Sequence, residues 1–141
     1  MSRIFWDTML FVYLLDEHPE YFNKSRDLLE RSFERGDLLF TSHLALGELM
    51  AGLTVSPKPH VRATVRETLT EMGFHFLPFD DGSVGPFSNL RAKQKLRIAD
   101  SIHLACAASH GIDLFLTGDK DLFKVHVPGV QFIADFNAAI Y

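Results

Sequence analysis

Cysteine is almost absent from the sequence, because Cys106 is the single cysteine among 141 residues. One cysteine cannot form a disulfide within the chain, so the protein is not a disulfide-stabilised scaffold, and a reducing compartment is expected. Positive charge is not in excess either, since 14 Lys and Arg against 18 Asp and Glu give a formal net charge of −4. This balance excludes a histone-like or wholly basic nucleic-acid-binding protein and leaves room for a local basic patch.

Long hydrophobic runs are missing as well. A membrane-spanning helix needs about 18 or more uncharged apolar residues, and residues 38–57, which come closest, are broken by Glu48 and Pro57. The apolar stretch at residues 1–15 is interrupted by Asp7 and lacks the small-residue cleavage site of a signal peptide. We therefore expect no membrane association and a cytoplasmic location.

The sequence does contain short apolar runs within an ordinary globular composition of 47% hydrophobic residues. These runs lie at residues 4–6, 38–40, 74–77, 114–116 and 130–133. Most are continuous rather than alternating, which is typical of strands buried on both faces of a parallel sheet.

Segments with helical signals separate these runs. The predicted helices are residues 20–35, with Phe33 on the apolar side, and then 42–49, 61–72 and 98–110. Strands that alternate with helices predict right-handed crossovers and a single three-layer α/β domain over residues 1–141. We expect a central, mainly parallel sheet of four or five strands flanked by helices. Residues 80–88 are expected to be irregular or to open a helix at Asp80 or Asp81.

Three acidic residues stand alone in apolar surroundings. Asp7, Glu48 and Asp100 are the only Asp, Glu, Lys or Arg within residues 4–15, 38–57 and 98–112, respectively. An isolated carboxylate in an apolar region is costly unless something pairs with it. Each residue alone also fits an ordinary helix cap or surface position, but three of them in one small domain suggest a shared counter-charge.

The predicted topology brings these acids to one edge of the sheet. Asp7 ends the first strand, Glu48 lies on the helix after the second strand, and Asp119 follows residues 114–117 by two positions. The helix that begins near Asp100 should start at the same edge, where open α/β sheets form their functional crevice. Four carboxylates without a cysteine or histidine cluster favour a hard cation, Mg²⁺ or Mn²⁺, over zinc.

Four stretches of the sequence contain these acids: IFWDT at residues 4–8, LGEL at 46–49, IADSIHLA at 98–105 and LTGDKDLF at 116–123. In this order and chain length they resemble the PIN domain ribonucleases, in particular the toxin subunits of type II toxin–antitoxin pairs. The last two stretches are the most specific, and the resemblance covers most of the chain.

This resemblance implies a Mg²⁺- or Mn²⁺-dependent endoribonuclease. Asp7, Glu48, Asp100 and Asp119 would be the catalytic, metal-binding residues, with Asp121 as an auxiliary acid and Thr8 and Thr117 as supporting hydroxyls. The resemblance also implies an RNA substrate, a homodimer and a small antitoxin protein as partner. The alternative is a catalytically inactive PIN-like module that binds RNA or protein.

Two groups of basic residues are candidate RNA contacts. The run RAKQKLR at residues 91–97 ends just before Asp100 and offers Lys93, Lys95 and Arg97 to the phosphates that flank a cleaved bond. Arg62 and Arg66 lie four residues apart on a predicted helix and form a second group. The alternative for each group is a helix face that is exposed to solvent and does not contact RNA.

Other catalytic signatures are absent. The sequence contains no GxxxxGK[ST], GxGxxG, HExxH or GxSxG motif. A haloacid dehalogenase phosphatase needs a second aspartate two residues after the first, and that position holds Met9. We interpret Cys106 as a small buried hydrophobe and Trp6 as a core residue that points away from Asp7. His103, three residues after Asp100, either contacts the site or is hydrogen-bonded beneath it.

Overall fold

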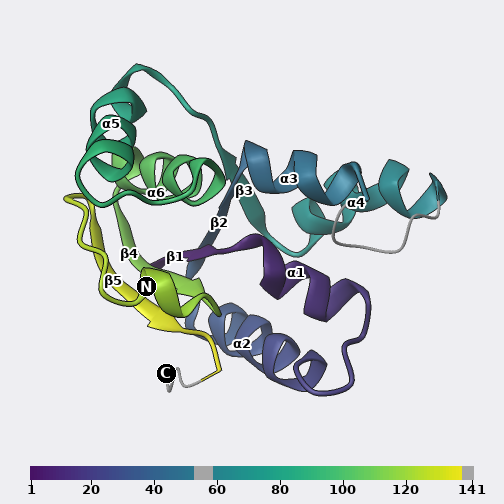
Figure 1. Cartoon of the computed structure of the whole chain (residues 1–141). Helices are drawn as coiled ribbons and strands as arrows, with labels where there is room; N and C mark the ends of the chain where they lie inside the picture. The colour runs from purple at the N-terminus through teal and green to yellow at the C-terminus, as the bar shows by residue number, and fades with distance from the viewer. Residues whose placement is uncertain (53–58, 138–141) are drawn as a thin grey trace.

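The computed structural model describes residues 1–52 and 59–137, with the backbone alone for residues 59–63. Five strands form one parallel sheet in the order β3-β2-β1-β4-β5 (Figure 1). They are β1 (Arg3–Trp6), β2 (Leu38–Ser42), β3 (Phe74–Leu77), β4 (Ile112–Thr117) and β5 (Val130–Asp135). Each predicted apolar run lies in one of these strands, and the predicted α/β fold class is confirmed.

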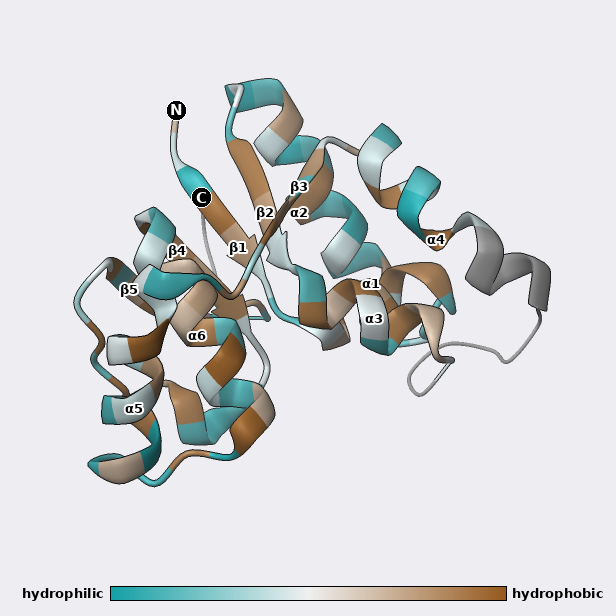
Figure 2. Cartoon of the chain, turned by 90° about the horizontal axis from the view of Figure 1, so that it is seen from above, coloured by the Kyte–Doolittle hydropathy of each residue, from teal (hydrophilic) through white to brown (hydrophobic). Residues whose placement is uncertain are grey.

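Helices cover both faces of the sheet. One face is covered by α1 (Thr8–Leu15), α2 (Phe22–Arg35), α3 (His43–Met50) and α4 (Pro59–Glu71), and the other by α5 (Val84–Ala92) and α6 (Ile98–His110). Short 3-10 helices, η1 (Asp81–Ser83) and η2 (Lys120–Leu122), complete the chain. Figure 2 shows the two groups of helices on opposite sides of the strands.

Strand β1 shows how the sequence builds this arrangement. Successive side chains of a strand point to opposite faces, so Ile4 and Trp6 join the cluster under α1–α4, whereas Phe5 joins the cluster under α5 and α6. The ring of Phe5 stacks on Phe115 of β4 at a centroid distance of 4.7 Å. Trp6 is completely buried, which confirms its predicted place in the core.

The predicted helix boundaries hold where the sequence carries a cap. Gly36 ends α2 in a left-handed conformation with φ of 70°, a conformation that glycine adopts without steric cost. Ser42 begins α3 by accepting a hydrogen bond from the backbone N–H of Ala45 at 3.0 Å. Pro59 stands at the first position of α4, where its missing N–H is not needed.

Two details differ from the sequence-based expectation, and one open choice is decided. Helix α1 was not predicted, because seven of its eight residues are apolar and show no helical period. Of the two possibilities for residues 80–88, the helix that opens at Asp80 or Asp81 is confirmed: Asp80 caps η1, and α5 follows with Pro86 in its first turn. Phe33 is 82% exposed, since it lies five residues after the buried Leu28 and thus about 140° around α2.

No helix in residues 1–52 and 59–137 has both the length and the apolar composition that crossing a membrane requires.

Cys106 packs within the cluster under α6, and burial together with the charge of Asp80 raises the pKa of its thiol to about 11. Only the thiolate is reactive, so we expect the native protein to react with a disulfide reagent at pH 8 about a hundredfold or more slowly than the denatured chain. The reaction is followed by absorbance with and without guanidinium. Equal rates would show that the thiol is accessible and that α6 does not pack in this way.

Candidate active site

The predicted acids line one pocket at the carboxyl-terminal edge of the sheet. The pocket has a volume of about 350 Å³, and seven of the residues singled out from the sequence line it: Asp7, Thr8, Glu48, Arg97, Asp100, His103 and Asp119. The topology explains why they meet. Helices α1 and α3 begin where β1 and β2 end, and α6 begins at this edge because it returns the chain to the start of β4.

Asp7 is held in place by both of its carboxylate oxygens. It caps α1, with Oδ1 accepting from the backbone N–H of Thr8 at 2.8 Å, and Oδ2 accepts from the hydroxyl of Thr117 at 2.7 Å. The simple helix-cap interpretation of Asp7 is therefore correct, and the same side chain also lines the pocket.

Thr117 connects Asp7 to Asp119. Its hydroxyl oxygen accepts from the backbone N–H of Asp119 at 3.1 Å while the hydroxyl donates to Asp7. Asp119 in turn caps η2, because its Oδ1 accepts from the backbone N–H of Asp121 at 3.0 Å. Thr117 is fully buried behind the pocket, so its hydroxyl orients the two acids without facing the pocket itself.

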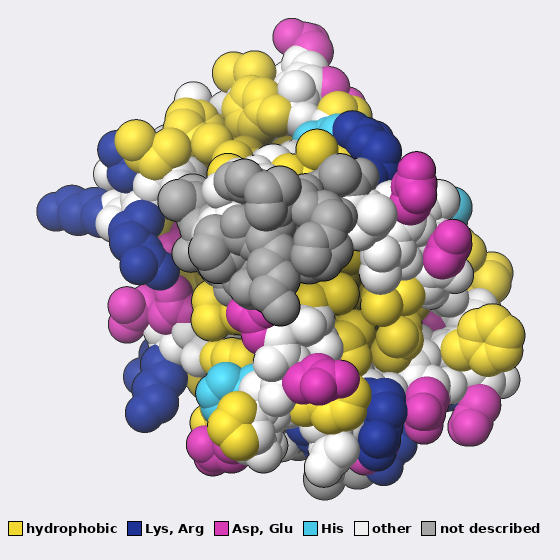
Figure 3. Space-filling model, turned by 90° about the vertical axis from the view of Figure 1, so that its right-hand side faces the viewer, with side chains coloured by type: hydrophobic (Ala, Val, Ile, Leu, Met, Phe, Trp, Pro, Cys, Tyr) yellow, Lys and Arg dark blue, Asp and Glu magenta, His cyan; other side chains and the backbone are white. Residues whose placement is uncertain are grey.

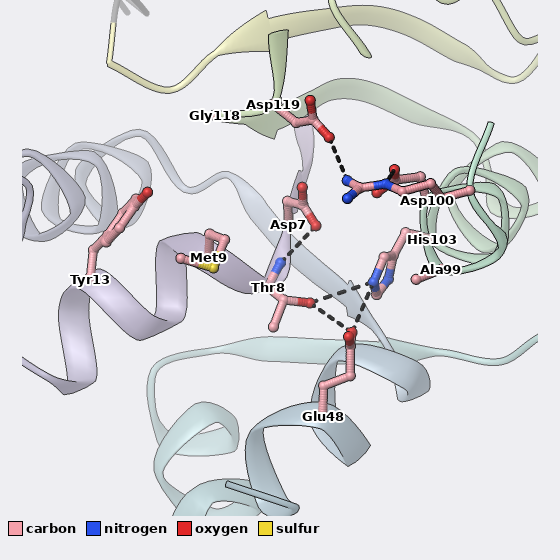
Figure 4. Close-up of a pocket in the computed structure, with 11 residues that line it drawn as sticks. Asp7, Thr8, Met9, Tyr13, Glu48, Ala99, Asp100, His103, Gly118 and Asp119 are labelled. Carbon is pink, nitrogen blue, oxygen red and sulfur yellow. Dashed lines mark hydrogen bonds and ion pairs between the residues drawn. The ribbon is translucent and has the colours of Figure 1, made fainter. Parts of the chain in front are cut away.

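Glu48 projects from α3 toward α1 and α6 (Figure 4). Its Oε1 accepts from the hydroxyl of Thr8 and from Nε2 of His103, each at 3.1 Å. The hydrogen bond with His103 is the main reason why the pKa of Glu48 lies below its ordinary value; the Thr8 hydroxyl acts in the same direction, and burial opposes both. Glu48 is consequently ionised at neutral pH.

Arg97 lies between two of the acids. Its Nε donates to Asp100 Oδ2 at 2.9 Å, and its NH2 group donates to Asp119 Oδ2 at 2.8 Å. In the sequence Arg97 was a candidate contact for RNA phosphates, and the structure instead pairs it with the acids. Its side chain is 76% exposed, and ion pairs this exposed contribute only about 0–1 kcal/mol, so a competing cation can displace it at little cost.

Asp100 differs from Glu48 in its electrostatics. Burial raises the pKa of its carboxyl, the paired Arg97 opposes this, and the charges of Asp7 and Asp119 add to the increase. Four carboxylates and a single guanidinium line this pocket, which leaves an excess of negative charge that attracts cations.

The remaining residues predicted for the site lie outside this pocket. Asp121 is exposed next to Asp119, and Lys93 and Lys95 are exposed between α5 and α6. The basic run is not a helix face, because α5 ends at Ala92 and Lys95 adopts a φ of 55°. Arg66 packs its guanidinium 5.7 Å from the Phe76 ring, and the side chain of Arg62 is outside the part of the chain that the structure describes.

Basic side chains elsewhere are mixed with acidic ones. On the face shown in Figure 3, which contains the end of the molecule near α4, the visible Lys and Arg side chains stand in separate groups among Asp, Glu and hydrophobic side chains. This mixing agrees with the net charge of −4.

The pocket also contains residues that were not assigned to it from the sequence. Met9 and Tyr13 of α1 form an apolar wall opposite Asp100 and His103 (Figure 4). Burial, followed by the charges of Tyr21 and Asp7, raises the pKa of the Tyr13 hydroxyl. The unbroken apolar run of α1 hid these two residues, because it gave no period from which to assign a face.

His103 both contacts the site and is hydrogen-bonded beneath it, so the two possibilities considered from the sequence hold together. The ring is only 3% exposed and is hydrogen-bonded beneath the pocket, yet it also lines the pocket wall.

The donor set suits a hard cation, since the pocket supplies carboxylate oxygens and no thiolate. Among the described residues, however, no three His, Cys, Asp or Glu side chains converge closely enough to hold a metal ion as they stand. Asp100 and Asp119 are bridged by Arg97 instead.

Comparison with known proteins places this fold. No match to a curated protein sequence was found. The fold is similar to VapBC2 from Rickettsia felis bound to a promoter DNA fragment, with a TM-score of 0.73 and 17% identity over 94% of this chain and 97% of that one. DNA-bound VapBC from Salmonella typhimurium has a TM-score of 0.73 and 20% identity, over 96% of this chain and 99% of that one. FitAcB from Neisseria gonorrhoeae has a TM-score of 0.67 and 19% identity, over 96% of this chain and 99% of that one.

The sequence itself also matches a family. The profile of the PIN domain family aligns with residues 4–127, a range that contains β2, β3, β4, all but the first residue of β1, and all four acids of the pocket. This range covers well over half of the 141 residues. The chain therefore belongs to the PIN domain family.

Proposed function

We propose that this protein is an endoribonuclease that depends on Mg²⁺ or Mn²⁺ and hydrolyses RNA phosphodiester bonds. The observation that carries the proposal is that Asp7, Glu48, Asp100 and Asp119, from four separate segments of the chain, line one pocket. A cluster of carboxylates that repel one another is expensive to assemble, and a divalent cation that binds all of them removes this cost.

In this proposal the four carboxylates hold the metal after Arg97 has moved away from Asp100 and Asp119. The bound ion would polarise the phosphodiester and lower the pKa of the attacking water. The chain itself keeps the acids oriented: Thr117 fixes Asp7 and Asp119, and Thr8 fixes Glu48. Asp121, exposed beside Asp119, acts as an auxiliary acid at the rim of the pocket.

The released Arg97 is then available to the phosphate next to the cleaved bond, because guanidinium groups pair with phosphate as readily as with carboxylate. Lys93 and Lys95, exposed on the same connection between α5 and α6, extend the positive charge away from the pocket. The Met9 and Tyr13 wall offers an apolar surface for a base of the bound strand.

We further propose that residues 1–141 form a single PIN domain and act as the toxin of a toxin–antitoxin pair, as a homodimer with a small antitoxin protein as partner. The support is the likeness of the fold to toxin–antitoxin complexes, among them one from Klebsiella pneumoniae, with a TM-score of 0.67 and 22% identity over 90% of this chain and 94% of that one.

An inactive RNA- or protein-binding module is the second candidate, and the pairing of Arg97 with two of the four acids favours it. The two candidates differ in one experiment. The purified protein is incubated with single-stranded RNA in EDTA, in Mg²⁺ and in Mn²⁺, and the products are separated on a denaturing gel. Cleavage that appears with either metal and stops in EDTA supports the nuclease; intact RNA under all conditions supports the inactive module.

Lys93 and Lys95 give a separate prediction about RNA binding. Replacing both with Ala should weaken binding and reduce the slope of log K against log[salt] by about 0.7 for each phosphate of single-stranded RNA that is no longer neutralised. Binding is measured by fluorescence anisotropy at several salt concentrations, in EDTA so that the RNA remains intact. Lys24→Ala with Arg31→Ala removes the same charge from α2 and should leave the slope unchanged. Equal slopes for both double variants would show that the α5–α6 connection does not touch RNA.

A further inference from the structure

A buried hydrogen-bonded chain lies beneath Glu48. Oγ of Ser42 is 2.7 Å from Nδ1 of His103, and Nε2 of the same ring is 3.1 Å from Oε1 of Glu48. Ser42 is fully buried and His103 is 3% exposed. The chain links three elements, since Ser42 ends β2, His103 lies on α6 and Glu48 lies on α3.

The hydrogen bonds of Ser42 determine which nitrogen of His103 carries the proton. The oxygen of Ser42 already accepts from the backbone N–H of Ala45, and its single proton still needs an acceptor, as buried polar groups do. Among the described residues, Nδ1 of His103 is the acceptor that the hydrogen-bond pattern offers. Nδ1 is then unprotonated, the proton is on Nε2, and Nε2–H donates to Glu48.

This assignment also explains the position of Glu48. Its Oε1 accepts from Nε2–H of His103 and from the hydroxyl of Thr8, and neither bond uses Oε2. Two donors on one oxygen fix the carboxylate while the second oxygen remains for a ligand. Both nitrogens of His103 are engaged within the protein, so the ring has no nitrogen left with which to bind a metal or take a proton from the substrate.

We propose that Ser42 and His103 are positioning residues for the reaction: Ser42 fixes the tautomer of His103, and His103 fixes Glu48 in the pocket. The inference rests on the proposed function, because it assigns the purpose of this order to Glu48 as a metal-binding acid. Hydrogen-bonded partners of metal ligands typically change metal affinity or activity by about 10–100-fold when they are removed.

The test uses two pairs of variants in the full chain. His103→Phe removes both ring nitrogens, whereas His103→Gln places an amide N–H near the position of Nε2. Ser42→Ala removes the hydroxyl, whereas Ser42→Thr keeps it. For each protein, Mn²⁺ affinity is measured without RNA by electron paramagnetic resonance of the free ion, and kcat and KM are measured with RNA. Circular dichroism checks the fold, and His75→Phe on β3, where the side chain is exposed, is the matched histidine control.

We expect His103→Phe and Ser42→Ala to lower both kcat and Mn²⁺ affinity by about 10–100-fold without changing KM for RNA. His103→Gln and Ser42→Thr should recover part of both losses, and His75→Phe should behave as the wild type. If His103→Phe does not fold, the serine pair decides the question by the same measurements.

Three results would overturn the inference: unchanged kcat and Mn²⁺ affinity in the folded His103→Phe or Ser42→Ala protein, a change in KM alone, or no recovery in folded His103→Gln and Ser42→Thr. A wild-type protein that neither binds Mn²⁺ nor cleaves RNA would overturn the proposed function and this inference together. If the wild-type protein binds Mn²⁺ and cleaves RNA, and the variants do so equally well, only the positioning role would be overturned.

Discussion

Replacing Asp100 by Asn should lower the rate of metal-dependent RNA cleavage by about a hundredfold or more while the protein keeps its fold. Asn preserves the shape of the side chain but removes one of the negative charges that would hold the metal. Stability should be unchanged or slightly higher. The pKa of Asp100 is raised by burial, so its ionised form costs folding free energy at every pH above that pKa, and the neutral amide removes this cost.

The matched control is Asp81→Asn, which neutralises an exposed acid in η1. It should cleave RNA at the wild-type rate. Initial rates with a labelled RNA and melting temperatures by differential scanning fluorimetry are measured for both variants. An Asp100→Asn protein with full activity would remove Asp100 from the site. One that unfolds would mean that the ion pair with Arg97 is worth more than its exposure suggests.

Added Mn²⁺ or Mg²⁺ should raise the melting temperature by several degrees, and Asp7→Asn should abolish most of the increase. The folded protein brings four carboxylates into one pocket, whereas the unfolded chain cannot, so the cation binds the native state preferentially. Metal at about 100 times its dissociation constant would add about 2.7 kcal/mol, and each kcal/mol corresponds to at least about 2 °C for a chain of this length.

Ca²⁺ separates binding from catalysis in the same experiment. It should also raise the melting temperature, because it accepts carboxylate ligands in loose geometry, while supporting little cleavage. Asp81→Asn again provides the control, and metal should raise its melting temperature by as much as that of the wild type. If none of the three ions changes the melting temperature across the millimolar range, Arg97 binds the acids more strongly than the ions do. The inactive module would then be the better description.

Much of the fold could be predicted because the apolar runs are unambiguous. A parallel strand buried on both faces is a continuous apolar run in sequence, as residues 4–6 of β1 show, and glycines mark the ends of α2 and α6. Helix α1 could not be predicted, since the seven apolar residues in a row at positions 9–15 carry no periodicity. A helix opening at Asp80 or Asp81 could be predicted only as one of two possibilities, because Gly85 and Pro86 also indicate a break, although Pro86 is tolerated in a first helical turn.

Three of the pocket acids, Asp7, Glu48 and Asp100, could be predicted because each lies alone in an apolar stretch. Asp119 could be predicted because it closely follows a predicted strand. The interactions among them could not. Arg97 lies just outside the apolar stretch around Asp100, and only the three-dimensional structure shows that its side chain turns back to two acids. Ser42 was identified as a helix cap, and its second role depends on a contact with His103, 61 residues away.

The most direct test of the account is the position of a bound ion. Crystals soaked in millimolar Mn²⁺ should show an anomalous scattering peak in the pocket, with oxygens of Asp7 and Asp100 at about 2.0–2.6 Å, the range for oxygen ligands of hard divalent cations. The guanidinium of Arg97 should have moved away from Asp100 and Asp119. A pocket without a peak, in which Arg97 still bridges the two aspartates, would contradict the proposed metal site and with it the assignment of this protein as a metal-dependent ribonuclease.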